Sequence, residues 1–236
     1  MKNFNILQKK LSILWICTIA FGVASMTLSS CSTQRATQSR DKSIKEWESF
    51  EFQEIKKSSN GELGKWAIYS RKIKGSNFLE YKIEGVIGAT AKACIEAFKQ
   101  EIHNQAGDLE NKKYPTYEIV REFGDSLLTY VIHNEPFPLK DTEMSVMYTF
   151  FNDEEGSTGV TWHEAWDESQ VQPSKKLNRV ETFRGSWSFT PTSGNFWHAA
   201  NSVQFDPKGM PLWLVKPMVI KFLKNGLEDI REATSK

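Results

Sequence analysis

The sequence has few cysteines, no concentrated excess of basic residues and no motif of a metal-dependent or phosphate-binding enzyme. Three cysteines occur in 236 residues, too few for a disulfide framework. The 30 Lys and Arg nearly balance the 29 Asp and Glu, which argues against a nucleic-acid partner. Glycine-rich phosphate loops, cysteine pairs at zinc spacing and the Gly-x-Ser-x-Gly motif of hydrolases are missing. We therefore expect neither a metal ion nor a cofactor.

Aromatic residues, by contrast, are abundant. They make up 12% of the chain, with 8 Trp and 15 Phe. The rest of the composition, 39% hydrophobic and 25% charged with 14 Gly, is that of a globular protein. One domain must therefore place many large rings, either in a packed core or around a bound molecule.

The first thirty residues have the pattern of a bacterial lipoprotein signal. Three lysines precede an apolar run over 11–24, which is too short for a transmembrane helix. After this run comes Leu28-Ser29-Ser30-Cys31, which resembles the bacterial lipobox. The resemblance implies that Cys31 is acylated and becomes the N-terminus. A transmembrane anchor and a secreted protein with a free Cys31 are the alternatives.

This interpretation divides the chain into a signal peptide over 1–30, an acylated cysteine with a flexible tether over 31–43, and a folded domain over 44–236. Acyl chains hold a protein durably on a membrane, and Ser32 in place of an aspartate favours the outer membrane. We expect a lipid-anchored protein of the bacterial envelope that faces the periplasm. Cys94 has no partner for an internal disulfide, and its place on a helical stripe predicts a buried, unreactive thiol.

Hydrophobic periodicity predicts a domain with more strands than helices. Alternating apolar residues predict strands at 65–72, 78–87, 118–123, 126–133, 143–151, 159–167, 179–190 and 195–205. A turn at Gly75-Ser76-Asn77 joins the first two strands. A short helix is expected around Ile44, Trp47 and Phe50, and another is expected after Thr90, a suitable N-cap.

A long helix is expected over 211–233. Its apolar stripe consists of Val215, Met218, Val219, Phe222, Leu223, Leu227 and Ile230. Pro217 is expected to kink this helix or to divide it. Because a curved antiparallel sheet must cover its inner face, this helix is the candidate to cover it. The fold class is therefore α+β.

Four segments of the domain resemble the START domain, the lipid-binding branch of the helix-grip superfamily. They occur in family order: 47–88, the Pro-Phe-Pro turn within 134–141, Arg184-Gly185-Ser186-Trp187-Ser188-Phe189-Thr190-Pro191, and Phe205-Asp206-Pro207-Lys208-Gly209 with Pro211-Leu212-Trp213-Leu214-Val215. Lys208, where many relatives have a glycine, and the unaligned segment 104–117 are departures. The resemblance implies a helix-grip fold, a curved antiparallel sheet wrapped around the long C-terminal helix, with an apolar tunnel between them for a lipid or another hydrophobic molecule.

The resemblance and the strand alternation suggest which residues contact such a ligand. Along a strand, neighbouring side chains point to opposite faces, so Phe183 and Trp187 share one face and Arg184 lies on the other. The ligand-binding candidates are Phe183, Arg184, Trp187, His198, Trp213, Met218, Val219 and Phe222. Arg184, His198, His133 and Glu164 are candidates for the polar groups that orient a ligand. For each aromatic residue taken singly, filling a packed core is the alternative.

These observations predict a membrane-anchored, monomeric lipid-binding protein, not an enzyme, that acts in lipid transfer or sensing in the envelope. Apolar burial alone would hold its ligand. Two alternatives stay open. One is a cyclase- or hydrolase-type enzyme, for which His133 and Glu164 are the acid/base candidates. The other is a non-catalytic protein-interaction module, because fold likeness does not determine function.

Overall fold

The computed structural model describes residues 50–135, 140–153, 156–192, 195–206 and 212–235. The predicted signal peptide, Cys31, the tether and the helix expected around Ile44 and Trp47 lie outside the described residues. Among the described residues, no helix is long and apolar enough to cross a membrane.

One large sheet makes up most of the described chain. Its strands are β1 (Gln53–Ser59), β2 (Lys65–Lys72), β3 (Leu79–Ile87), β4 (Thr116–Phe123), β5 (Ser126–His133), β6 (Thr142–Asn152), β7 (Thr158–Glu164), β8 (Asn178–Arg179), β9 (Phe183–Pro191) and β10 (Trp197–Phe205). The order across the sheet is β1-β2-β3-β10-β9-β7-β6-β5-β4, and all of these pairings are antiparallel. The short β8 lies off this path and pairs with β6 in parallel.

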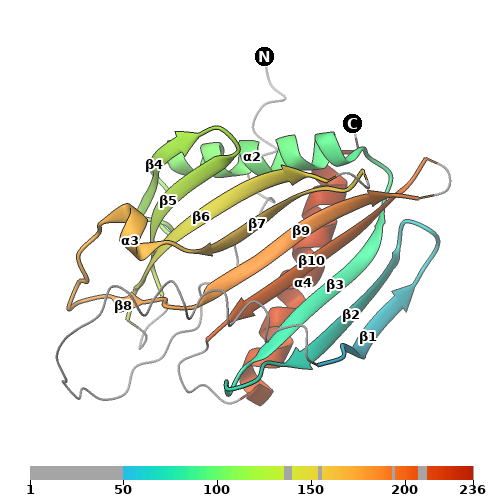
Figure 1. Cartoon of the computed structure of the whole chain (residues 1–236), viewed down its shortest axis with the longest axis horizontal. Coiled ribbons are helices and arrows are strands. Elements are labelled where there is room, and N and C mark those ends of the chain that lie inside the picture. The colour runs from blue at the N-terminus through green and yellow to red at the C-terminus, as the bar shows by residue number, and fades with distance from the viewer. Residues whose placement is uncertain (1–49, 136–139, 154–155, 193–194, 207–211, 236) are drawn as a thin grey trace.

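Three described helices accompany the sheet: α2 (Ala91–Gly107), α3 (Trp166–Ser169) and α4 (Leu212–Ala233). Figure 1 shows the long α4 crossing behind the middle of the twisted sheet, with α2 lying across one end of the strands. Contacts of α4 with β3, and of α2 with β4, β7 and α4, agree with this arrangement. The sheet and its C-terminal helix therefore form the α+β architecture that the sequence predicts.

The helix α4 forms because its apolar residues recur at helical spacing on one side. Val215, Val219, Phe222, Leu223, Leu227 and Ile230 are all buried. Pro217 does not divide the helix, which runs without a break from Leu212 to Ala233. The proline lies close to the N-terminus, so its missing N–H affects only the carbonyl of Trp213 in the first turn.

We call the sheet face that packs against α4 the inner face. A Cβ at Gly85 in β3 would lie 2.6 Å from Cδ2 of Leu227, so glycine allows the helix to approach the strand closely. Tyr81, Ile83 and Ile87, which alternate with the outward residues of β3, point to the same face and are buried. The helix end is fixed here by Arg231, whose Nε and Nη2 both donate to the carbonyl of Val86 at 2.9 and 2.8 Å.

The helix α2 begins where the sequence predicts. The hydroxyl of Thr90 accepts a hydrogen bond from the N–H of Ala93 at 3.2 Å, which satisfies one of the free donors of the first turn. Cys94 is fully buried on the apolar stripe of α2, and burial raises the pKa of its thiol to about 12. The prediction of a buried Cys94 is confirmed.

Two element predictions need correction, and one strand was not predicted. The strand expected to reach Asp167 ends at Glu164, because the chain turns at the buried Ala165 into the short helix α3. The strand expected over 179–190 is divided into β8 and β9. The edge strand β1 was not anticipated, since its residues are mostly exposed and show no apolar alternation.

Candidate functional site

The strand register brings four residues into one row across the inner face. Trp162 of β7 lies opposite Gly185 of β9, Gly185 lies opposite Val203 of β10, and Val203 lies opposite Tyr81 of β3. The next row toward the C-terminal end of β3 contains Trp187, Asn201 and Ile83. All of these side chains share the face that α4 covers, because residues directly opposite each other project to the same side of a sheet.

The indole of Trp162 lies over the backbone of Gly185. A Cβ at Gly185 would lie 2.4 Å from Cζ2 of Trp162, closer than any real contact. Phe98 of α2 stacks on the indole with ring centroids 6.5 Å apart, and the ring of Phe183 lies 6.0 Å away. Glycine at this position therefore allows an aromatic wall to extend from β7 across β9 toward β10.

This apolar region contains polar atoms that have no hydrogen-bond partner among the described residues. They are Nε1 of Trp162, the hydroxyl of Tyr81 and Oδ1 of Asn201. The three residues are 6%, 1% and 1% exposed. A buried polar group without a partner costs about 1–3 kcal/mol, and such groups are normally satisfied by water or a ligand. The inner face therefore offers free hydrogen-bonding groups in an apolar setting.

Five of the eight predicted ligand-binding residues belong to the interior. Phe183, Trp187, Val219 and Phe222 are buried, and Met218 packs against them while partly buried. Trp187 stacks on Phe189 at 5.6 Å, and a Cβ at Gly226 of α4 would lie 3.7 Å from its Cζ2. Trp187 therefore packs directly against the C-terminal half of α4, whereas Val219 and Phe222 belong to the preceding turns of the helix.

The other three candidates lie outside the interior. Arg184 faces away from α4, and its Nε donates to both carboxylate oxygens of Glu164 at 2.9 and 3.0 Å. His198 also lies on the outer face, with Nε2 3.9 Å from a carboxylate oxygen of Glu84. The side chain of Trp213, in the first turn of α4, is 75% exposed. Arg184 and His198 are therefore separated by the sheet from the space between the sheet and α4, and the side chain of Trp213 is directed mainly to solvent.

The suggested pair of His133 and Glu164 does not form, because Glu164 binds Arg184. His133 is buried on the inner face at the end of β5, and its Nδ1 lies 3.0 Å from Oε1 of Glu135. The hydroxyl of Thr142 donates to the same carboxylate oxygen at 3.2 Å. Sequence reasoning missed Glu135 as a partner of His133. The two side chains come together because of the path that the backbone takes directly after the end of β5, which strand alternation does not predict.

A buried carboxyl group marks the junction of the two long helices. The pKa of Glu101 on α2 is raised to about 7, chiefly by burial; the hydrogen bond from Gln105 opposes the shift, and the nearby charge of Asp229 on α4 adds a smaller part of it. The Gln105 amide donates to Oε1 of Glu101 at 2.7 Å. This group lies near Tyr117 and one turn of α2 beyond Phe98.

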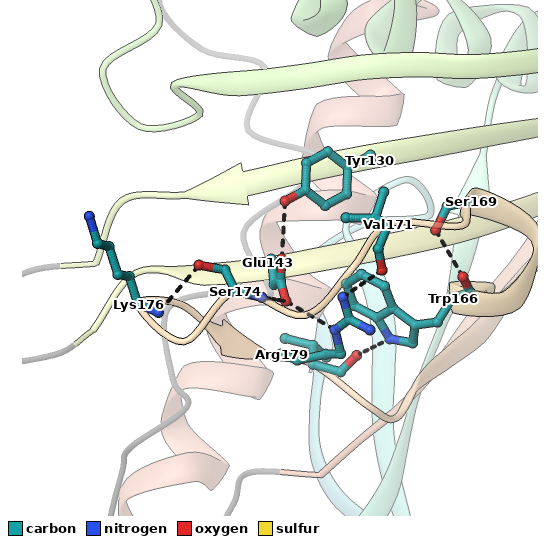
Figure 2. A network of polar contacts seen from close by, with 9 residues as sticks. Tyr130, Glu143, Trp166, Ser169, Val171, Ser174, Lys176 and Arg179 are labelled. Atoms are coloured by element: carbon teal, nitrogen blue, oxygen red, sulfur yellow. Dashed lines mark hydrogen bonds and ion pairs between the residues drawn. The ribbon is translucent and has the colours of Figure 1, made fainter.

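On the outer face, a polar network holds the connection between β7 and β9 (Figure 2). The carboxylate of Glu143 accepts hydrogen bonds from the hydroxyl of Tyr130 at 3.1 Å and from Nε of Arg179 at 3.0 Å. The guanidinium of Arg179 stacks 3.7 Å from the ring of Trp166. Each member of this network has a structural partner, and no cluster suited to a metal ion occurs among the described residues.

Two comparisons by sequence find nothing: no model of a known protein family and no curated protein sequence matches the chain. Solved structures do match the fold. The STAR-related lipid transfer protein of Xanthomonas axonopodis (fragment 25–204) has a TM-score of 0.60 and 17% identity, over 78% of this chain and 99% of its own. Human StAR-related lipid transfer protein 5 has a TM-score of 0.62 and 11% identity, over 86% and 96%.

The lipid transfer and protein localization domain of human StarD13 matches with a TM-score of 0.59 and 12% identity, over 87% of this chain and 98% of its own. These likenesses confirm the predicted fold class: the chain has the START-like helix-grip fold, with an open antiparallel sheet and a long C-terminal helix. At identities of 11–17% the likeness shows the fold, and the ligand depends on the residues of this chain.

Proposed function

We propose that this chain binds a lipid or another hydrophobic molecule between the inner face of the sheet and the N-terminal half of α4. The observation that carries the proposal is the set of buried polar atoms without partners on an otherwise apolar inner face: Tyr81 Oη, Trp162 Nε1 and Asn201 Oδ1. Ligand sites are mostly apolar with a few polar groups that fix orientation. Two of the matching structures are lipid transfer proteins by name, which supports the same class of ligand.

The driving force is the removal of apolar surface from water, worth about 25 cal/mol per Å². The residues we assign to the ligand are Phe183, Met218, Val219 and Phe222, together with Tyr81, Trp162 and Asn201. We place Trp187 with the packed core, because its ring lies against Gly226 of α4.

The ligand enters at the N-terminal half of α4. Arg231 fixes the C-terminal half through the carbonyls of Val86 and Lys65, at distances of 2.8–2.9 Å. Leu227 and Gly226 are in close contact with the sheet at the same end. The turns around Val215 and Val219 are packed into the interior by buried apolar side chains, and we assign to them the part of the helix that separates from the sheet.

An acylated Cys31 would hold this domain at the membrane of a bacterial envelope, facing the periplasm. The lipobox-like sequence before Cys31 and the polar segment that follows it support this part of the proposal. Transfer or sensing of a lipid, without chemical change to it, is the corresponding activity.

Native mass spectrometry followed by organic extraction tests the proposal. The chain is produced from Ser32 onward, which retains every described element, since all of them follow residue 49. A stoichiometric hydrophobic molecule that leaves only on denaturation is the expected result. An unliganded mass that does not change after incubation with a lipid mixture would favour an interaction module, and a chemically altered lipid would favour an enzyme.

A further inference from the structure

We infer that Tyr81, Trp162 and Asn201 form a polar anchor on the inner face that binds one uncharged oxygen group, a hydroxyl or a carbonyl, of the hydrophobic ligand. The inference rests on the proposed function and adds the chemical class of the molecule. It predicts a long-chain alcohol, a sterol-like alcohol, a ketone or an ester in preference to a fatty acid or an amine.

The three polar groups gather around Val203. Tyr81 on β3 and Gly185 on β9 lie on either side of Val203, and the Trp162 indole covers Gly185. Asn201 lies two residues from Val203 on β10 and is therefore a diagonal neighbour of Tyr81 on the same face, roughly 7 Å away. We therefore place the polar group of the ligand over Val203, between these three side chains.

The chemistry of these atoms suits a neutral oxygen. The indole Nε1 only donates, the amide Oδ1 only accepts, and the phenol does both. A ligand hydroxyl has two lone pairs, so it can accept from both Trp162 and Tyr81 while it donates to Asn201. A ligand carbonyl can accept from both Trp162 and Tyr81.

The charge around the anchor excludes an ionised ligand group. The pKa of Tyr81 is raised by burial alone, and no charged side chain contributes to this shift in the described part of the chain. The buried carboxyl of Glu101 lies at the junction of α2 with α4, near Asp229, and is not a cation. A carboxylate or ammonium group at the anchor would be buried without a counter-ion, which costs far more than a hydrogen bond returns.

The test compares four probes of one chain length: dodecane, 1-dodecanol, laurate and dodecylammonium. Their dissociation constants are measured by native mass spectrometry for the chain from Ser32 onward and for two variants, Tyr81→Phe and Trp162→Phe. The matched control is Tyr69→Phe, because Tyr69 lies on the opposite face of β2 and remains partly exposed.

We expect 1-dodecanol to bind the parent chain about tenfold more tightly than dodecane, and each anchor variant to reduce this ratio by about 2- to 10-fold. The control leaves the ratio unchanged. Because Trp162→Phe also removes part of the packed wall, Tyr81→Phe, which removes a single oxygen, is the decisive variant.

Equal binding of dodecane and 1-dodecanol, an unchanged ratio in Tyr81→Phe, or tighter binding of laurate or dodecylammonium than of 1-dodecanol would overturn the anchor while the proposed function stands. Binding of none of the four probes to the parent chain overturns the proposed function together with the anchor.

Discussion

The side chain of Trp162 occupies the place that a Cβ of Gly185 would need: the two would lie 2.4 Å apart. A glycine on β9 thus determines how far the indole of β7 can reach across the inner face. The consequence is a wall of Trp162, Phe98 and Phe183 whose one polar atom, Nε1, has no partner among the described residues.

Gly185→Ala is expected to destabilise the fold by about 1–3 kcal/mol, since the new methyl group overpacks the site. Besides the indole, it would meet the carbonyl oxygen of Ser202 at 2.3 Å, and backbone cannot move aside cheaply. Urea unfolding measures the change. Gly107→Ala is the control, because a Cβ there meets nothing within 4 Å, and an equal loss in both variants would contradict the packing account.

Glu101→Gln is expected to stabilise the protein above pH 7, by on the order of 1–2 kcal/mol. Burial raises the pKa of Glu101 to about 7, above its ordinary 4.5, so the folded chain binds the proton more tightly than the unfolded chain. Stability contributed by this group is therefore present at low pH and is lost as the pH rises from about 4.5 through 7.

The amide cannot ionise, so the variant lacks this loss. The measurement is the free energy of unfolding at pH 5 and pH 8 for both proteins. Glu96→Gln, on an exposed position of the same helix, serves as the control. The same pH dependence in the parent and in Glu101→Gln would show that the junction of α2 and α4 does not titrate in this range.

Glu143→Gln is expected to loosen the connection between β7 and β9 and to cost about 3 kcal/mol, because it leaves the guanidinium of Arg179 without its buried partner. Glu143 is 1% exposed and lies in the middle of the network of Figure 2. Hydrogen exchange should become faster in 165–180, with the central strands still protected. The exposed pair of Lys224 and Glu228 offers a comparison, since Glu228→Gln should change stability by less than about 0.5 kcal/mol.

Much of the fold could be predicted because alternation and helical spacing are local signals. The strands β2 and β5 have the predicted bounds, and α2 begins after the predicted cap Thr90. The division of β8 from β9 could not be predicted, since it depends on a contact between Arg179 and Glu143, which are 36 residues apart. The helix α3 could not be predicted either. It follows Ala165, which packs in a small hydrophobic cluster with Leu128 of β5 and Met147 of β6, and these contacts are distant in the sequence.

The site could be predicted only in part. Helical spacing correctly placed Val219 and Phe222 in the interior, and alternation placed Phe183 there. The same alternation puts Arg184 on the opposite face, so the two could not both contact a ligand. Asn201 could have been found in the sequence, because it is a polar residue between Ala199 and Val203 on an otherwise apolar strand face. That the hydroxyl of Tyr81 and Nε1 of Trp162 lack hydrogen-bond partners among the described residues could not, because it depends on the register of four strands.

Val219→Trp is expected to reduce ligand binding more than tenfold, because an indole at this buried position occupies the space we assign to the ligand, at a cost in stability of about 1–3 kcal/mol. Val219 is 4% exposed on the face of α4 that the sheet covers. Lys216→Trp adds the same ring on the exposed side of the helix and should bind ligand like the parent chain. Equal binding by both variants would place the ligand elsewhere.

The central claim is that a hydrophobic molecule lies between the inner face and the N-terminal half of α4. A crystal structure with 12-bromo-1-dodecanol tests it most directly, because the anomalous signal of bromine locates the alkyl end of the ligand independently of the other electron density. The account predicts the bromine between the sheet and the turns around Val215 and Val219, with the hydroxyl at Tyr81, Trp162 and Asn201. Bromine found only on the surface, with the side chains of the inner face packed against α4 as before, would contradict it.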